Sequence, residues 1–357
     1  MAATAGFLGL LSPLYRLVVQ TRLKLYETGV LRSETLPHPV ISVGNLTTGG
    51  TGKTPLVMYL AQILKQAGLQ PAILTRGYKG RAEQTAALAS DGSRNLASAE
   101  ESGDEACLMA TRLEGVPIAV GKARDQSARL IPGFGANRKL VFILDDAYQH
   151  LQIVRNLNIL VLDATDPFGG GRLLPAGRLR EPLSAIKRAD LVIVTRAHLP
   201  FDQELLETEI RRRNRLAKIS YFYHDAVGLV ELGTGASYPV RHLLHARVVA
   251  VSAIGNPAVF LQDLAHYQID VAESITFRDH HVFSSEDLKK IYSRARSLDV
   301  RAVVTTEKDT VRLHGSTGHD TPVYALRIEA KPEDPEKFER DLIEEVRGWL
   351  SKGTQGT

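Results

Sequence analysis

The sequence predicts an α/β protein: a doubly wound, mostly parallel sheet of the P-loop NTPase type, with a second, smaller α/β domain and an N-terminal amphipathic helix. Three observations support this fold class. Short Val/Ile/Leu runs alternate with helical stretches, a glycine-rich loop lies between an apolar run and a helix, and the alternation resumes after a looser segment. Continuous apolar runs are typical of strands buried on both faces of a parallel sheet, and the alternation is typical of βαβ units.

The first expected element is the amphipathic helix, within residues 1–30. Ser12 followed by Pro13 is typical of a helix start, and Gly29 of a helix end. An apolar stripe lies beside a polar one in this segment: Tyr15, Val19, Leu23 and Tyr26 against Arg16, Gln20, Lys24 and Glu27. Most such helices pack on their own domain, whereas the uncharged leader and the basic side chains favour a membrane surface. Both interpretations stay open, and the stretch falls short of the ~20 apolar residues that span a bilayer.

The P-loop core is expected over residues 31–222. Its expected strands are residues 39–43, 71–75, 139–144, 158–162 and 190–195, with helices at 55–66 and 105–113. The pattern loosens around residues 221–236, where a domain junction is expected. The smaller domain, residues 223–350, has expected strands at 247–252, 300–305 and 322–326 and helices at 257–266, 285–298 and 334–350, and residues 351–357 are expected to form a flexible tail.

Composition restricts the expected cellular location and binding partners of the protein but does not indicate a function. The 357 residues contain a single cysteine, Cys107, which excludes an internal disulfide framework and makes a reducing cytoplasm the simplest location. The formal net charge of +4 favours anionic partners such as phosphates or acidic lipids. We expect no nucleic-acid partner and no obligate protein partner.

The strongest motif is the segment GNLTTGGTGKT at residues 44–54. Glycines allow backbone N–H groups to wrap a phosphate, and the N-terminus of the following helix adds partial positive charge. The predicted nucleotide-binding residues are Thr47, Thr48, Gly49, Gly50, Thr51, Gly52, Lys53 and Thr54. Lys53 is expected to reach the β- and γ-phosphates, and the Thr54 hydroxyl to bind Mg²⁺. The strict motif has glycine where this chain has Thr47, and the Gly49–Gly50 pair is expected to restore the lost backbone freedom.

A second phosphate-site signal is the apolar run 139–144, which ends in Asp145 and Asp146 and is typical of a Walker B strand.

A P-loop identifies the leaving group and leaves the acceptor open. GTPases are not supported, because residues 306–309 read TEKD instead of a guanine-reading order, and MinD-like ATPases have lysine where this chain has Thr48. A P-loop switch or assembly ATPase remains the alternative to a kinase.

Further segments extend the pattern over most of the chain. They are PVISVGNLTTGGTGKTP (39–55), TRGYKG (75–80), SGDE (102–105), DDAYQH (145–150), GRLLPAGRLREP (171–182), FRDHHVF (277–283) and TEKD (306–309). In this order they resemble the tetraacyldisaccharide 4'-kinase family, which phosphorylates a lipid A precursor. The family usually reads DDGFQH where this chain has Ala147 and Tyr148, which questions whether the backbone at residue 147 needs glycine.

The resemblance implies an ATP- and Mg²⁺-dependent enzyme at the cytoplasmic face of the bacterial inner membrane. Its expected acceptor is the 4'-hydroxyl of a tetraacylated glucosamine disaccharide 1-phosphate. The chain therefore has two expected partners outside itself, the lipid A disaccharide precursor and the membrane surface, which it would contact as a peripheral protein.

The resemblance also implies roles for individual residues. Asp104 is the expected general base and His280 its partner, although an aspartate that opens a helix commonly only complements the helix dipole. Thr54, Asp145, Asp146 and Glu181 are the expected Mg²⁺ ligands, although Glu181 also fits a surface ion pair. The expected substrate contacts are Arg76, Tyr78, Gln149 and Arg180, for which turn-stabilising or packing roles are the alternatives. The roles of Lys53, Asp104 and His280 are expected to be catalytic.

Overall fold

The computed structural model describes residues 2–313 and 321–353, so part of the expected tail, residues 354–357, lies outside the described residues. The strands are β1 (Val40–Asn45), β2 (Gln70–Thr75), β3 (Ala87–Ser90), β4 (Ile118–Val120), β5 (Leu140–Leu144), β6 (Leu157–Asp163), β7 (Leu191–Thr195), β8 (Lys218–Glu231), β9 (Ser237–Tyr238), β10 (Arg247–Ser252), β11 (Asp270–Thr276), β12 (Ala302–Thr306) and β13 (Val323–Pro332). The α-helices are α1 (Ala2–Glu27), α2 (Lys53–Gln66), α3 (Ala99–Ser102), α4 (Asp104–Arg112), α5 (Arg124–Arg129), α6 (Gln203–Arg213), α7 (Pro257–His266), α8 (Ser285–Ser297), α9 (Glu307–Thr310) and α10 (Pro335–Gly353).

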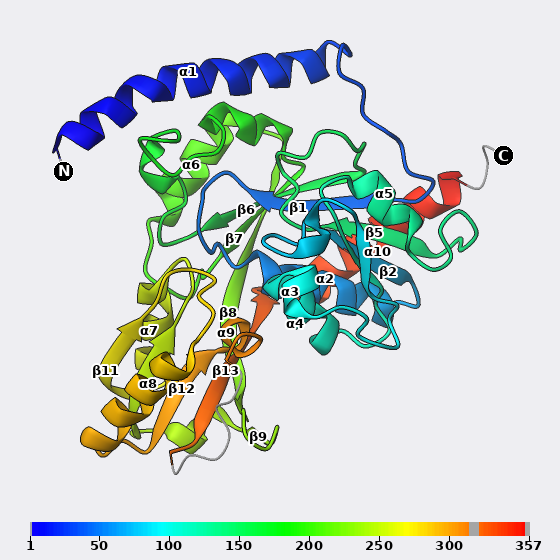
Figure 1. Ribbon diagram of the computed structural model, residues 1–357. Helices are drawn as coiled ribbons and strands as arrows, with labels where there is room; N and C mark the ends of the chain where they lie inside the picture. The colour runs from blue at the N-terminus through cyan, green and yellow to red at the C-terminus, as the bar shows by residue number, and fades with distance from the viewer. Residues whose placement is uncertain (1, 314–320, 354–357) are drawn as a thin grey trace.

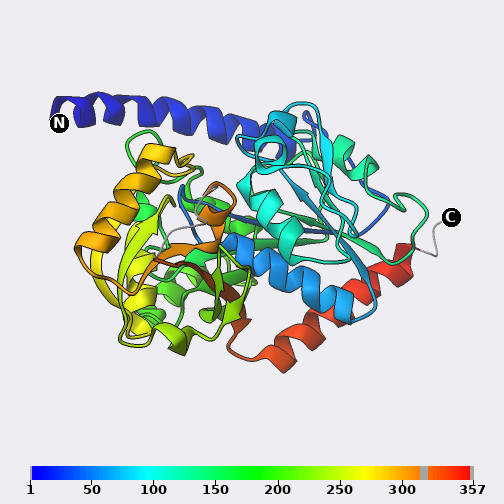
Figure 2. The ribbon, with the colours of Figure 1, turned by 60° about the horizontal axis from the view of Figure 1, so that its bottom comes forward.

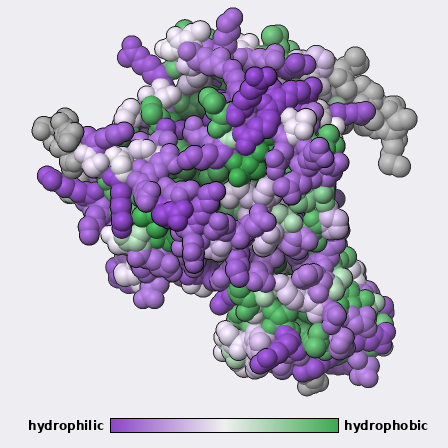
Figure 3. All heavy atoms as spheres, turned by 180° about the vertical axis from the view of Figure 1, so that it is seen from behind, coloured by the Kyte–Doolittle hydropathy of each residue, from purple (hydrophilic) through white to green (hydrophobic). Residues whose placement is uncertain are grey.

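In the described residues the strands form one 13-stranded sheet, in the order β11-β10-β12-β13-β8-β7-β6-β1-β5-β2-β4-β3, with β9 paired to β8 (Figure 1). Most neighbouring strands are parallel, which confirms the predicted fold class. We call β1–β7 with their helices the larger unit, and β9–β13 with α7–α9 the smaller unit. Seen from behind, the smaller unit projects beneath the larger one, and most of this face is hydrophilic (Figure 3).

The strand β8 belongs to both units. Its first half pairs in parallel with β7, and its second half pairs antiparallel with β13. The expected boundary at residue 222 therefore falls inside a continuous strand, at the point where β8 changes its partner. Only alternate residues of β8 are buried over much of its length, so the strand lacks the continuous apolar run from which the other strands were predicted.

The terminal helix α10 packs against the larger unit, although residues 223–350 were expected to form one smaller domain. Leu342 and Val346 are buried in the same core cluster as Leu56 and Leu60 of α2. Figure 2 shows α10 beside α2 on the underside of the larger unit. The reason is the direction of β13, which runs antiparallel to β8 and returns the chain to the edge of the larger unit.

The helix α1 begins at Ala2 and continues through Pro13, so the helix start expected at Ser12 was wrong. The Ser12 hydroxyl instead donates to the carbonyl of Leu173 at 3.2 Å. Figure 1 shows α1 lying along the top of the larger unit. Its inner stripe is half-buried on the protein, whereas Leu14, Leu17 and Val18 on the opposite side are each 60% exposed. No helix among the described residues combines the length and the apolar character needed to cross a bilayer.

The register of the sheet gathers polar loops at one edge. β1 lies between β5 and β6 and is parallel to both, and β7 is parallel to β6. Because parallel strands end at the same edge of a sheet, the phosphate loop after β1 lies near Asp145 and Asp146 after β5 and near Arg196 after β7. This edge faces the smaller unit and is where the candidate site lies.

Candidate active site

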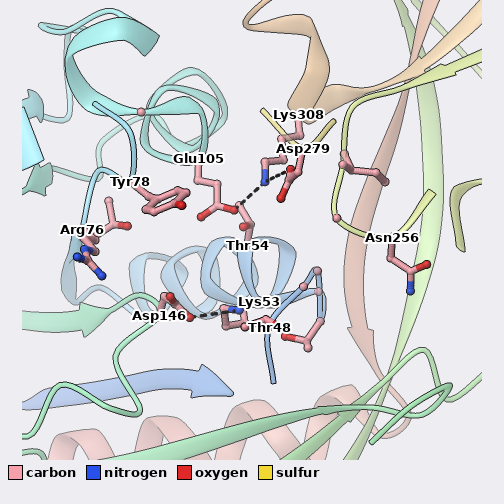
Figure 4. Close-up of a pocket in the computed structure, with 18 of the residues that line it drawn as sticks. Thr48, Lys53, Thr54, Arg76, Tyr78, Glu105, Asp146, Asn256, Asp279 and Lys308 are labelled. Carbon is pink, nitrogen blue, oxygen red and sulfur yellow. Dashed lines mark hydrogen bonds and ion pairs between the residues drawn. The ribbon is translucent and has the colours of Figure 1, made fainter. Parts of the chain in front are cut away.

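A cavity of about 980 Å³ opens between the two units at this edge of the sheet. Its walls come from the phosphate loop, the end of β5, the start of α4, the inner stripe of α1, and the starts of α7 and α9. Figure 4 shows Thr54, Glu105 and Lys308 together above the pair of Lys53 and Asp146, with Tyr78 on one side and Asn256 on the other. Segments that lie far apart in the sequence therefore contribute to one cavity.

The phosphate loop takes its shape from two glycines. Gly49 has φ 110° and Gly52 has φ 75°, in the left-handed region that favours glycine. A Cβ atom at Gly52 would also overlap the imidazole of His224. Thr47 is buried without a positive φ, and its carbonyl accepts a hydrogen bond from the Asn45 side chain at 2.8 Å. Threonine is therefore accommodated at residue 47, because the left-handed positions lie two and five residues later.

Two arginines hold the outer side of this loop, and sequence analysis missed both. Arg178 donates to the carbonyl of Thr48 at 2.9 Å, and Arg196 donates to the carbonyl of Gly50 at 3.1 Å. Arg196 is itself buried and paired with Asp163. These contacts fix the loop through its carbonyl oxygens. Neither arginine is part of a phosphate-loop motif, so no sequence signal identified them.

Lys53 and Asp146 form an ion pair at the start of α2. The Lys53 Nζ atom lies 3.3 Å from Asp146 Oδ1 and 3.1 Å from Asn45 Oδ1. Arg180 binds the same aspartate at 2.9 Å. Although burial raises the pKa of Asp146, Lys53 and Arg180 outweigh it and hold the pKa below its usual range. Phosphate oxygens would therefore meet two cations, Lys53 and Arg180, that a single carboxylate holds in place.

The replacement of the family's glycine by Ala147 is explained by the backbone. Asp146 has φ 47°, whereas Ala147 has no positive φ and is buried in the core. The adjacent Tyr148 is also buried, and its hydroxyl donates to the carbonyl of Ala185 at 2.7 Å. Alanine therefore fits at residue 147, and tyrosine fits at residue 148 because its hydroxyl has a partner.

Asp145 lies behind Asp146 and is buried. Its Oδ2 atom accepts a hydrogen bond from the Thr75 hydroxyl at 2.9 Å, whereas its buried Oδ1 atom has no hydrogen-bond partner. Burial first, and then the negative charges of Glu105 and Asp146, raise the pKa of Asp145 to about 7. An unpartnered buried carboxylate oxygen beside a phosphate loop fits a site for a hard cation.

Glu181 lines the cavity, and its expected place among the Mg²⁺ ligands stays a prediction. It is buried in an ion pair with Arg188, which also lies over the ring of Tyr148. A further acidic neighbour of Asp145 is Glu105, which binds Lys308 at 3.1 Å and also lines the cavity. Sequence analysis gave Glu105 no role because its position depends on how α4 packs. Among the described residues, no three His, Cys, Asp or Glu side chains converge on a single metal position.

Asp104 and His280 meet across the two units. The Nδ1 atom of His280 lies 2.8 Å from Oδ2 of Asp104, whose side chain is 2% exposed. Burial raises the pKa of Asp104, but the hydrogen bonds from His280 and Arg312 outweigh it and keep the carboxyl ionised. The neighbouring His281 contacts Asp287 at 2.9 Å instead, so the geometry distinguishes the two histidines.

Comparison with known proteins identifies a family for this chain. The model of the family described as tetraacyldisaccharide-1-P 4'-kinase matches residues 4–347. The chain belongs to this family. A tetraacyldisaccharide 4'-kinase of Desulfatibacillum aliphaticivorans is 39% identical over 347 residues, covering 95% of this chain and 92% of that protein. One of Halothermothrix orenii is 37% identical over 343 residues, covering 90% and 88%. The crystal structure of LpxK from Aquifex aeolicus in complex with ATP matches with a TM-score of 0.74 and 32% identity, covering 96% of this chain and 99% of that one.

The four residues expected to contact substrate all line the cavity of this tetraacyldisaccharide-1-P 4'-kinase family member. Arg180 pairs with Asp146, and the Gln149 side chain donates to the carbonyl of Asn45 at 2.9 Å. Arg76 binds Glu83 at 2.6 Å and stays exposed, and the exposed Tyr78 lies 5.5 Å from the His280 ring. Lys308 also faces the cavity, while Thr306 caps α9.

Proposed function

We propose that this chain transfers the γ-phosphate of ATP to the 4'-hydroxyl of a tetraacylated glucosamine disaccharide 1-phosphate, in lipid A biosynthesis. One observation carries the proposal: Lys53 of a phosphate loop and His280 of the Asp104–His280 pair line the same cavity. A phosphoryl donor site and a proton-accepting pair on one cavity are what transfer to an alcohol requires. Family membership and the ATP-bound relative support the choice of reaction and donor.

Mg²⁺ is the proposed companion of ATP. Thr54 and Asp146 offer a hydroxyl and a carboxylate to the cavity, and the buried Asp145 next to Asp146 has an unpartnered oxygen. Mg²⁺ commonly uses one or two protein carboxylates and completes its octahedron with phosphate oxygens and water, so a denser protein cluster is not needed. When bound, the ion would neutralise charge on the β- and γ-phosphates. Glu181, which lines the same cavity and pairs with Arg188, stays a proposed ligand.

The Asp104–His280 pair is the proposed proton acceptor. Because Asp104 is ionised, it accepts the Nδ1–H of His280, and the lone pair of that ring is on Nε2, which lies 3.8 Å from Asp279 Oδ1. His280 lines the cavity and Asp104 does not, so the hydroxyl proton reaches the pair at Nε2. The charge of Asp104 then stabilises the imidazolium and makes the pair basic. Asp104 was expected to be the general base; in this proposal Asp104 supplies the negative charge, and His280 is the group that meets the acceptor.

A peripheral position at the cytoplasmic face of the inner membrane follows from the acceptor. Tetraacylated lipid stays in the bilayer because each buried methylene contributes about 0.8 kcal/mol. Tyr15 and Val19 of α1 line the cavity, while Leu14 and Leu17 face outward. We expect the double variant Leu14→Glu/Leu17→Glu to lose flotation with anionic vesicles, while Leu244→Glu, an exposed leucine of the smaller unit, keeps it. Equal flotation of both variants would contradict the membrane role of α1.

The reaction is tested by following labelled γ-phosphate from ATP in the presence and absence of the tetraacylated disaccharide 1-phosphate. We expect label on the lipid, strong stimulation of ATP turnover by lipid, and loss of both in Lys53→Ala. ATP hydrolysis that proceeds equally without lipid and leaves the lipid unlabelled would instead favour a P-loop switch or assembly ATPase.

A further inference from the structure

The contact between α4 and the segment after α9 contains an arginine to which the proposed reaction gives no role. Arg312 Nε lies 2.5 Å from Oδ1 of Asp104, and its NH1 atom donates to the carbonyl of His280 at 3.1 Å. One guanidinium group therefore contacts both members of a pair that are 176 positions apart in the sequence. Arg312 is not among the described residues that line the cavity. Any effect of Arg312 on the reaction therefore passes through Asp104 and His280.

The backbone of His280 needs support of this kind. His280 has φ 63°, a left-handed conformation that non-glycine residues rarely adopt and that is strained. Its N–H donates to the carbonyl of Ala253 at 3.1 Å, and its own carbonyl accepts from Arg312. With both backbone groups held, the imidazole is directed at Asp104.

The carboxylate of Asp104 is held in the same way. His280 occupies one of its oxygens and Arg312 the other, and the side chain is almost fully buried. A guanidinium group presents its donors in a rigid planar fork, so it fixes the direction of a carboxylate as well as its charge. Lysine at this position would keep the charge and lose the fixed spacing between the two acceptors.

We propose that Arg312 is a positioning residue that holds Asp104 and His280 in their reactive arrangement when the two units meet. This inference rests on the proposed function of the pair. The same interface provides a matched control, because Arg112 of α4 binds Glu307 at 2.6 Å and Glu329 at 2.8 Å. Arg112 thus joins the two units without contacting the pair.

The test compares Arg312→Gln, Arg312→Lys and Arg112→Gln for kcat, KM for ATP and the pH dependence of kcat. Arg312→Gln is expected to lower kcat by about 10²-fold with KM for ATP changed less than about twofold. Loss of the cation should also move the acidic limb about one unit to higher pH, because protonation of the pair becomes easier. Arg312→Lys is expected to have an unshifted acidic limb but a low kcat. Arg112→Gln is expected to keep both the acidic limb and kcat near their wild-type values.

An unchanged kcat and acidic limb in Arg312→Gln would overturn the inference, as would the same shift in Arg112→Gln. If Arg312→Gln does not fold, the test rests on Arg312→Lys. A wild-type kcat in Arg312→Lys would overturn the inference, and a low kcat with an unshifted acidic limb of the pH profile would support it. Titration of the His280 ring by NMR in the free protein gives a readout without turnover, and its midpoint should rise in Arg312→Gln. A wild-type protein that leaves lipid unlabelled refutes the proposed function, while the NMR titration still decides the role of Arg312.

Discussion

Replacing Asp104 with Asn is expected to lower kcat by about 10²–10⁴-fold, the usual contribution of a positioned base. In the structure Asp104 Oδ2 accepts the Nδ1–H of His280 at 2.8 Å, which leaves the lone pair on Nε2, 3.8 Å from Asp279 Oδ1. An amide can turn its NH₂ group to the ring and so favour the opposite tautomer, which carries hydrogen on Nε2. The imidazolium also loses its stabilising charge. The upper limit of the expected loss corresponds to about 5.5 kcal/mol of barrier.

The assay is the initial rate of label transfer to lipid in mixed micelles, with ATP affinity and thermal unfolding measured beside it. Unfolding matters because Arg312 loses its buried partner, and breaking a buried ion pair costs about 3–5 kcal/mol. Asp287→Asn is the matched control: Asp287 binds His281 at 2.9 Å away from the pair and caps α8, so it should cost about 1 kcal/mol of stability and leave kcat unchanged. The double variant Asp104→Asn/His280→Gln should be no slower than the slower single variant, since the two residues act as a unit. A retained kcat in Asp104→Asn, or losses that multiply in the double variant, would refute the reasoning.

Three further predictions concern the phosphate side of the cavity. Lys53→Ala should lower label transfer by at least about 10²–10³-fold, because it removes the cation that Asp146 holds at the phosphate loop. Gly52→Ala should abolish ATP binding in equilibrium dialysis, since the added Cβ requires a left-handed backbone and overlaps His224; wild-type affinity would contradict the loop geometry. Asp145, with a pKa raised to about 7, must lose a proton to bind a cation, so apparent Mg²⁺ affinity in transfer assays should weaken below pH 7 and reach a plateau above it. Because the folded pKa exceeds the unfolded one, stability from this group is complete at low pH, falls as pH rises toward 7 by about 1.4 kcal/mol per unit at most, and levels off above it. Asp145→Asn should therefore gain in Tm relative to wild type between about pH 5 and pH 7 and gain little more above pH 7.

Local elements of the fold could be predicted closely. The expected bounds of β10 and α7 agree with the structure, and the phosphate loop lies between β1 and α2 as expected. These elements are specified by adjacent residues, through apolar runs, glycines and helix-start signals. The path of β8 and the packing of α10 could not be predicted, because both depend on which strand edge the chain meets after β13.

In the candidate site, too, features set by local motifs could be predicted and long-range contacts could not. Lys53 and Asp146 lie where their motifs put them, and Asp104 contacts His280 as the family pattern led us to expect. The position of Glu105 beside Asp145 was missed, and so was Arg312. Arg312 is 208 positions from Asp104, and ion pairs over such separations leave no spacing pattern in one sequence.

The two halves of the site are mechanically connected through β8. The last parallel pair joins Tyr221 to Val194, and the first antiparallel pair joins Phe222 to Pro332, so one strand carries the hydrogen bonds of both units. His224 lies just beyond this change of partner and packs against Gly52 at the start of α2. A phosphate bound at Gly52 therefore acts directly beside the strand that sets the position of the smaller unit, and with it His280. We expect ATP to slow amide hydrogen exchange at residues 222–224 in the wild-type protein; exchange there that is unaffected by saturating ATP would show that the donor site and the proton acceptor are assembled independently.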